Sequence, residues 1–157
     1  MRHRIVMLAM ALMVVLGTGA AVAAGPAQAV QGPRLLLYTS VSRCIVAQGA
    51  GNQVAIKDPA GNYCARFTSI YIGMNFELKD GNGNCLRANS ASQVKIENGG
   101  CNSTDLNEQW YSYNCNAFSC NYVNVGRNAY LKTNGTSSGD LVYVGLMPGG
   151  YFRWSFG

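Results

Sequence analysis

The sequence predicts an all-β fold made of three copies of one four-strand unit, with about twelve short strands in all. The first observation is the regular spacing of two series of residues. One series opens each copy, and the other, which is aromatic, closes it. The openings follow at steps of 41 and 45 residues and the closings at steps of 43 and 44. The two series are Cys44, Cys85 and Tyr130, and Phe67, Trp110 and Trp154. Such a period indicates a repeated supersecondary unit whose copies share one core.

Two further observations support the fold class. Each copy carries a V-x-[IV] triplet about a dozen residues before its closing aromatic, and in such a triplet the branched residues point to one side of a strand. After the first 29 residues the chain holds no convincing 3.6-residue apolar period, and glycine and asparagine interrupt it often. We therefore expect strands and turns throughout, and no helix.

Residues 1–29 are predicted to be a secretory signal peptide. A positively charged start precedes the apolar run Ile5–Leu16, and Ala27–Ala29 forms an A-x-A cleavage site. The apolar run is shorter than the about 20 residues that cross a bilayer, so we expect cleavage rather than anchoring. The remaining residues 30–157 number 128 and fit a single domain. We expect a secreted, extracellular protein with no membrane contact after cleavage.

Cleavage would change the available chemistry. It would remove His3, the only histidine, and with it any imidazole for general base catalysis, proton relay or metal binding. Loss of Arg2 and Arg4 would lower the twelve basic residues to ten, against seven acidic ones, for a net charge of +3. Because the basic residues are spread over all three copies, a nucleic-acid partner is not expected. No cofactor is expected either.

All six cysteines follow the predicted cleavage site, and an oxidising compartment favours three disulfides. A zinc site is not expected, because tight C-x-x-C pairs are absent. Six cysteines allow 15 connectivities, but the repeat narrows them. Two cysteines open copies one and two, and two others each fall shortly before a closing aromatic, so equivalent bridges are predicted; the last pair would staple a hairpin. The predicted bridges are Cys44–Cys64, Cys85–Cys101 and Cys115–Cys120.

The first copy spans about residues 34–72. It begins with an apolar run bounded by Gly-Pro and by serines, which is typical of a strand. A V-x-I strand follows, and the turn signal Asp58–Asn62 precedes the strand that carries Phe67. The predicted strands of this copy are Leu35–Thr39, Cys44–Gln48, Val54–Lys57 and Tyr63–Ile72.

The second and third copies, about residues 73–114 and 120–157, repeat this order. Copy two has a turn at Asp80–Gly83 and a polar loop from Asn98 to Asn107, and copy three turns at Gly126–Asn128. The strands predicted in copy two are Asn75–Lys79, Cys85–Ala88, Val94–Ile96 and Trp110–Tyr113. Those predicted in copy three are Asn121–Val125, Ala129–Asn134, Val142–Val144 and Phe152–Phe156.

These motifs resemble a known family. Cys-Leu opening the second strand, V-x-[IV] in the third, and a polar turn leading to Gln-Trp are similar to the ricin-B type β-trefoil, the lectin-like QxW repeat. The resemblance covers essentially all of residues 30–157 and is closest in copy two, in DGNGNCLRAN and CNSTDLNEQW. It implies a six-stranded barrel closed at one end by three hairpins, with the closing aromatics in a shared core. It also implies the two within-repeat bridges and a module that binds a glycan or a cell-surface polymer.

The positions that hold galactose-like sugars in this family are altered in every copy. Two residues after the opening residue, where sugar-binding members usually carry Asp, stand Val46, Arg87 and Lys132. In place of the stacking aromatic just after V-x-[IV] stand Lys57, Glu97 and Gly145, and in place of Gln two before the closing aromatic stand Ala65, Glu108 and Phe152. A ring stacks on the sugar and a carboxylate fixes its hydroxyls, so loss of both predicts a degenerate galactose site.

The polar loop of copy two holds the first candidate ligand-binding residues. Asp105, Asn107 and Glu108 precede the closing aromatic, and the family geometry would place Arg87 beside them. Arg87 is a candidate to bind an acidic group such as a uronate or a phosphate. The competing interpretation is an ion pair with Glu97 or Asp105, because most surface charges are solvated or weakly paired.

Tyr143 is a separate candidate. It alternates with Val142 and Val144 along a strand, so its ring is predicted to face away from the core. There it would be a stacking platform for a ligand, or only a tolerated exposed tyrosine.

Three classes of function are compatible with these features. The first is the secreted glycan-binding module. The second is a protein-binding trefoil, such as an inhibitor of extracellular proteases, with loops Asp58–Asn62 and Thr133–Asp140 held rigid by disulfides. The third, an enzyme, is the weakest: a glycosidase needs only two carboxylates, but no acidic pair stands at a motif spacing. We therefore expect no catalytic residues.

Overall fold

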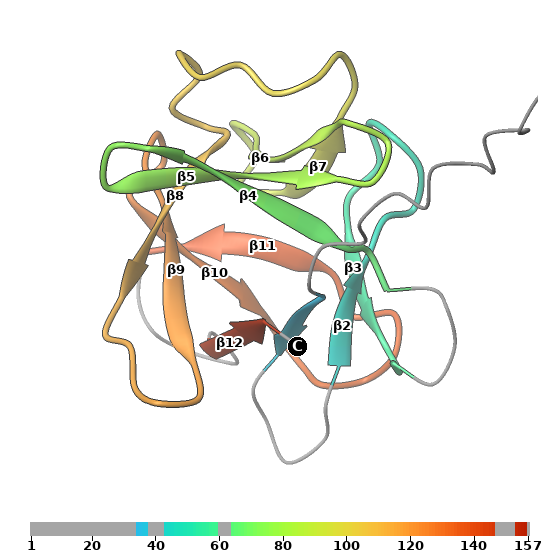
Figure 1. Cartoon of the computed structure of the whole chain (residues 1–157). Coiled ribbons are helices and arrows are strands. Elements are labelled where there is room, and N and C mark those ends of the chain that lie inside the picture. Colours follow the sequence, from blue (N-terminus) through green and yellow to red (C-terminus); the bar gives the residue numbers. More distant parts are fainter. Residues whose placement is uncertain (1–33, 38–42, 60–63, 147–152, 157) are drawn as a thin grey trace, which may run out of the picture.

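The computed structural model describes residues 34–37, 43–59, 64–146 and 153–156. These residues form twelve β-strands joined by turns and loops, as the repeat predicts (Figure 1). No helix in this part of the chain is long and apolar enough to cross a membrane. The predicted signal peptide lies outside the described residues.

Six strands form an antiparallel barrel. Along the sheet, each of them pairs antiparallel with the next, in the order β1, β12, β9, β8, β5 and β4. An isolated bridge between Arg34 and Arg66 joins the starts of β1 and β4 and closes the ring. The barrel strands are β1 (Leu35–Leu37), β4 (Phe67–Ile72), β5 (Asn75–Asp80), β8 (Gln109–Tyr113), β9 (Cys120–Asn124) and β12 (Arg153–Phe156).

The other six strands form three hairpins that close one end of the barrel. They pair as β2 with β3, β6 with β7 and β10 with β11, all antiparallel. The hairpins meet at equivalent valines: Val54 N donates to Val94 O at 2.8 Å, and Val142 N donates to Val54 O at 3.0 Å. The hairpin strands are β2 (Arg43–Val46), β3 (Ala55–Lys57), β6 (Cys85–Ala88), β7 (Val94–Glu97), β10 (Ala129–Thr133) and β11 (Val142–Gly145).

The predicted strands are present, with small differences at their ends. The strand predicted to run to Gln48 ends at Val46, because the chain turns at Gly49 and Gly51, whose φ values are +94° and +80°. Backbone at positive φ suits glycine and does not continue a strand. The closing strand of copy one begins at Phe67 rather than at Tyr63, and residues 60–63 lie outside the described part.

The three closing aromatics meet in one core, as predicted. Phe67, Trp110 and Trp154 are fully buried and belong to the same hydrophobic cluster. The indole of Trp110 donates to Leu86 O at 3.0 Å, and that of Trp154 donates to Leu131 O at 2.8 Å. Each indole thus anchors the barrel to the first strand of a hairpin while the ring fills the core.

In copy one the equivalent buried carbonyl has a hydrogen-bond donor other than an indole. The carbonyl of Ile45 stands where Leu86 and Leu131 stand in the other copies, but Phe67 has no N–H to offer it. The backbone N–H of Ala65 donates to Ile45 O instead, at 2.8 Å. Every copy therefore satisfies this buried carbonyl, as buried polar groups require.

All three predicted disulfides are present: Cys44–Cys64, Cys85–Cys101 and Cys115–Cys120. The first two each tie the opening of a copy to the segment before its closing aromatic. The third staples the loop between β8 and β9, which are antiparallel neighbours.

Trp110→Phe tests the indole anchor. The substitution leaves the Leu86 carbonyl without its donor, so the free energy of unfolding should fall by about 1–3 kcal/mol. Urea denaturation measures it. Tyr111→Phe is the matched control, because it removes a polar group from the half-buried neighbouring residue. Equal unfolding midpoints for the two variants would contradict the anchoring role.

The disulfides should differ in what they contribute. Bridge Cys44–Cys64 spans 20 residues and Cys115–Cys120 spans 5, so on the chain-entropy account their removal as double alanine variants should cost about 3 and about 2 kcal/mol. Chemical denaturation without reductant compares them. A larger loss for the Cys115–Cys120 variant would show that loop length does not set the order.

Candidate functional site

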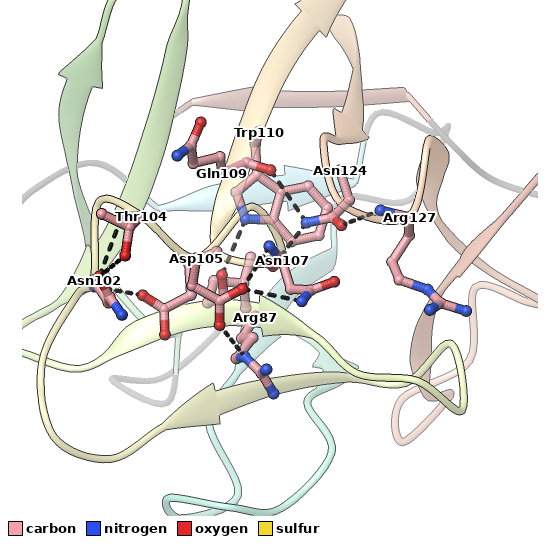
Figure 2. A network of polar contacts seen from close by, with 11 residues as sticks. Arg87, Asn102, Thr104, Asp105, Asn107, Gln109, Trp110, Asn124 and Arg127 are labelled. Carbon is pink, nitrogen blue, oxygen red and sulfur yellow. Dashed lines mark hydrogen bonds and ion pairs between the residues drawn. The ribbon is translucent and has the colours of Figure 1, made fainter.

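The polar loop of copy two folds around the carboxylate of Asp105 (Figure 2). Its Oδ1 accepts the backbone N–H and the side-chain amide of Asn107, at 2.9 and 3.0 Å, and its Oδ2 pairs with Arg87 Nε at 2.8 Å. Burial acts to raise the pKa of Asp105, but the hydrogen bonds from Asn107 and Arg87 outweigh it and hold that pKa below its ordinary value. The ion-pair interpretation of Arg87 therefore describes this arrangement.

Asn107 connects the hydrogen bonds of the polar loop in copy two to residues of copy three. Its carbonyl accepts Ala88 N at 3.0 Å and Asn124 Nδ2 at 2.8 Å, and Asn124 Oδ1 accepts Arg127 N at 3.0 Å, as Figure 2 shows. Gly126 packs tightly here, since a Cβ at this position would lie 2.7 Å from Asn107 Oδ1. The loop is held by its own side chains and by two neighbouring strands.

The structure thus brings four of the candidates together and places only Tyr143 apart. Asp105 bonds to both Arg87 and Asn107, so both oxygens of its carboxylate are engaged. Glu108 is buried beside them and accepts Asn102 N at 2.7 Å, whereas Tyr143 lies in copy three. These bonds give the loop its shape and leave the Asp105 carboxylate little capacity to bind a ligand.

A pair of acidic residues is buried beneath this loop. Glu77 is 2% exposed and Glu108 is 4% exposed. Burial, followed by the charge of Glu108, raises the pKa of Glu77; burial likewise raises the pKa of Glu108, despite the bond from Asn102. No described residue satisfies Glu77 Oε1. Because both carboxyls are shielded from solvent, this pair is not accessible to a polymeric substrate.

The same region contains three atoms at metal-ligand spacing. A carboxylate oxygen of Glu77 and the sulfurs of Cys85 and Cys101 lie within 4.8 Å of one another. The two sulfurs are joined in a disulfide, and a metal ion is bound by thiolates. The group therefore does not form a metal site in the oxidised protein.

Residues at the positions compared with the ricin-B type pattern have structural roles. Val46 packs with Cys44 and Cys64 in a small buried cluster. The side chain of Lys132 passes over Gly145, so that a Cβ at position 145 would lie 2.9 Å from Lys132 Cδ. Its Nζ lies 5.3 Å from the ring centroid of Tyr143, a cation–π distance. The space above Gly145, where the ricin-B type resemblance would place an aromatic ring, is thus occupied by the aliphatic stem of Lys132.

Tyr143 borders an open depression of about 500 Å³ among the three hairpins. We call this the Tyr143 depression. Its lining comes from all three copies, since an isolated bridge places Gln93 opposite Tyr143 and the Gln53 side chain donates to Val142 O at 2.8 Å. The lining residues are Gln53, Ala91, Ser92, Gln93, Asn134, Gly139, Asp140, Leu141 and Tyr143.

The depression offers both donors and acceptors. Gln53 Oε1, Gln93 Nε2 and Asn134 Nδ2 bond to no described residue, while the Tyr143 hydroxyl donates to Asn134 Oδ1. One carboxylate oxygen of Asp140 accepts Ser137 N at 2.8 Å. Burial raises the pKa of Tyr143, so its hydroxyl stays protonated at neutral pH. Amides, a carboxylate and a ring edge together suit a ligand rich in hydroxyl groups.

From the sequence, Tyr143 is proposed as a candidate and the polar residues that surround it are not. Gln53 and Gln93 each stand directly before a V-x-[IV] triplet, and Asn134 directly follows β10. The signal that could have found the two glutamines is their equivalence between copies: the residue before the triplet forms a bridge to the next copy, Gln53 to Lys95 and Gln93 to Tyr143.

The loops proposed for protease binding are only partly described. Residues 60–62 of loop 58–62 lie outside the described part. In loop 133–140, Gly139 N donates to Ile56 O at 2.8 Å, and Arg43 Nε donates to Thr136 O at 2.8 Å. These bonds turn the loop toward copy one, so that it does not present an extended segment to a protease.

The barrel, the hairpin cap and the threefold repeat define a β-trefoil protein. The designed protein ThreeFoil is similar, at TM-score 0.66 and 19% identity, over 79% of this chain and 96% of that one. So is a Haemophilus ducreyi cytolethal distending toxin chain, at 0.65 and 10%, over 84% and 86%. A Polyporus squamosus lectin, solved with a sialylated influenza-binding epitope, matches at 0.55 and 12%, over 80% and 49%. These identities establish the fold alone. No protein-family model and no curated protein matches the sequence.

Glu77→Gln tests the buried acid. A raised pKa means that the stabilising contribution of Glu77 is complete below its ordinary value of 4.5 and is lost as pH rises through the folded-state value. Relative to the native protein, the glutamine variant should therefore gain melting temperature between pH 4 and pH 7. Thermal unfolding across that range measures it. Glu97→Gln, at a half-buried position, is the control; a pH-independent difference for Glu77→Gln would refute burial of the charge.

Proposed function

We propose that this protein is a secreted glycan-binding module that holds its ligand in the Tyr143 depression. The observation that carries the proposal is the gathering of amide groups, a carboxylate and a tyrosine at the junction of the three hairpins. Sugar hydroxyls both donate and accept hydrogen bonds, and this lining offers both kinds of partner. The likeness to a lectin supports the class of function by analogy of fold.

Two features support this location over the galactose positions of the ricin-B type. In copies one and three those positions are taken up by Val46 in a buried cluster and by Lys132 across Gly145. In copy two, Arg87 is paired with Asp105. The groups lining the depression, by contrast, retain hydrogen-bonding capacity toward solvent.

The lining also suggests the ligand's chemistry. Lys132 covers one face of the Tyr143 ring, so a ligand would meet the edge or the other face of that ring. The carboxylate of Asp140 lies in the depression, and none of the lining residues is Lys or Arg. A neutral or amide-bearing sugar is therefore favoured over a uronate. Because the depression is open, affinity for a single residue should be modest and a polymer should bind more tightly through repeated contacts.

A glycan array followed by calorimetry tests the proposal. Tyr143→Ala and Gln93→Ala should each weaken binding of the best ligand by about tenfold, which is about 1.4 kcal/mol. Tyr113→Ala and Gln48→Ala are matched controls, since both residues are exposed and lie outside the depression. Equal weakening by the controls would place the ligand elsewhere. Silence toward all glycans and cell-surface polymers, with inhibition of a secreted protease, would favour the protein-binding alternative.

A further inference from the structure

Large apolar side chains are concentrated at one end of the barrel. Nine such residues are exposed in the described part of the chain, and six of them lie on the β4–β5 hairpin, at the β8–β9 loop or at the end of β12. The six are Ile70, Tyr71, Met74, Tyr113, Phe118 and Phe156. We call this end the open end.

The topology places these segments together. Neighbouring barrel strands are antiparallel, so the β4–β5 turn, the β8–β9 loop and the last residue of β12 all stand at the same end. The hairpins β2–β3, β6–β7 and β10–β11 are connected to the barrel strands at the opposite end (Figure 1). The open end therefore faces away from the cap that carries the Tyr143 depression.

A chain of aromatic rings supports this surface from within. Ring centroids are 6.3 Å apart for Tyr71 and Phe76, 5.6 Å for Phe76 and Tyr122, and 5.7 Å for Tyr122 and Phe156. The two inner rings are buried, whereas Tyr71 is 77% exposed and Phe156 is 39% exposed. The exposed rings are thus held by packing, which lowers the entropy lost when they meet a partner.

The shape of the surface suits a soft partner. Met74 is 95% exposed in the tight turn of one hairpin, and Phe118 is 70% exposed in the loop of the next. Separate apolar tips of this kind protrude from the fold, and a protein partner would need a matching hollow for each. A bilayer deforms around them, and tyrosine is enriched at its interface because its ring is apolar and its hydroxyl polar.

The charges complement an anionic surface. In the described barrel strands and their two connecting turns, the acidic residues are Glu77 and Asp80, and both are buried, at 2% and 9% exposure. Asp80 lies at the other end of the barrel, where its carboxylate accepts Asn82 N. Arg153 donates to Ser119 Oγ at 2.9 Å and to Asn114 O at 3.2 Å, which places its guanidinium at the β8–β9 loop.

We propose that the open end docks on the surface of a bilayer that contains anionic lipid, with the tips at Met74 and Phe118 among the headgroups. The guanidinium of Arg153, which lies at the β8–β9 loop that carries Phe118, is attracted to that surface. The sequence predicts no membrane contact because it lacks a spanning segment after residue 29, but surface docking needs none. Docking in this orientation leaves the cap free to face solution, and it does not depend on the proposed glycan site.

Co-sedimentation with vesicles tests the docking. Vesicles of phosphatidylcholine with phosphatidylserine should bind the protein, and phosphatidylcholine alone should bind it less. The variant Tyr71→Ser/Met74→Ser/Phe118→Ser should lower binding to the mixed vesicles by about tenfold or more. Leu106→Ser/Leu146→Ser is the matched control, since these exposed leucines lie in the polar loop of copy two and directly after β11, outside both the open end and the Tyr143 depression, and it should bind as the native protein does. Added salt should weaken binding of the native protein to the mixed vesicles.

Two results of the vesicle experiment would overturn the proposal. One is native protein that stays in the supernatant with both vesicles; the other is an open-end variant that sediments like the control. If the native protein forms a dimer in size-exclusion chromatography while the open-end variant is a monomer, the surface pairs two copies of the chain and the lipid proposal is wrong. Melting temperatures of both variants show whether they fold, and retained glycan binding would separate this test from that of the Tyr143 depression.

Discussion

The fold depends on burial of one aromatic side chain per copy against one backbone carbonyl. Trp110 and Trp154 satisfy the carbonyls of Leu86 and Leu131 through their indoles, and in copy one a backbone N–H satisfies Ile45 beside Phe67. A single copy could not exclude water from such a carbonyl. Three copies can, because their aromatics fill one another's space. The barrel and the cap are therefore held by the same residues.

The residues that stand where the ricin-B type resemblance would place sugar-binding groups serve the scaffold. Val46 extends a buried cluster around a disulfide, and Arg87 fixes the polar loop through Asp105. This loop then bonds to Asn124, so copies two and three are joined by polar contacts as well as by the core. A rigid frame of this kind leaves the molecule's two ends as the surfaces with capacity to bind: the cap with its amide groups and the open end with its rings.

The two ends differ in chemistry because they differ in construction. At the cap, residues next to the axis that relates the hairpins meet across copies, which gathers polar side chains such as Gln53 and Gln93. No hairpin covers the open end, so the buried rings of Phe76 and Tyr122 fill this end of the barrel. The rings of Tyr71 and Phe156 pack beside them and are exposed to solvent. A protein with these ends has the geometry to join a hydroxyl-rich ligand to a second surface.

The sequence by itself determined the fold class, the three copies, the shared aromatic core and all three disulfides. It could do so because the fold class, the copies, the core and two disulfides follow from a periodic pattern or from equivalent positions, and Cys115–Cys120 is the pair that remains. Only the tertiary structure decided which polar residues meet. Within copy two, the sequence left Glu97 and Asp105 open as partners of Arg87, and the fold of the polar loop brings Asp105 to it. Gln53 and Tyr143, which border one depression, are 90 positions apart and belong to copies one and three; whether such residues meet depends on how the copies turn about their axis. A one-dimensional period carries no information about that rotation, and contacts between copies are fixed only when the barrel closes.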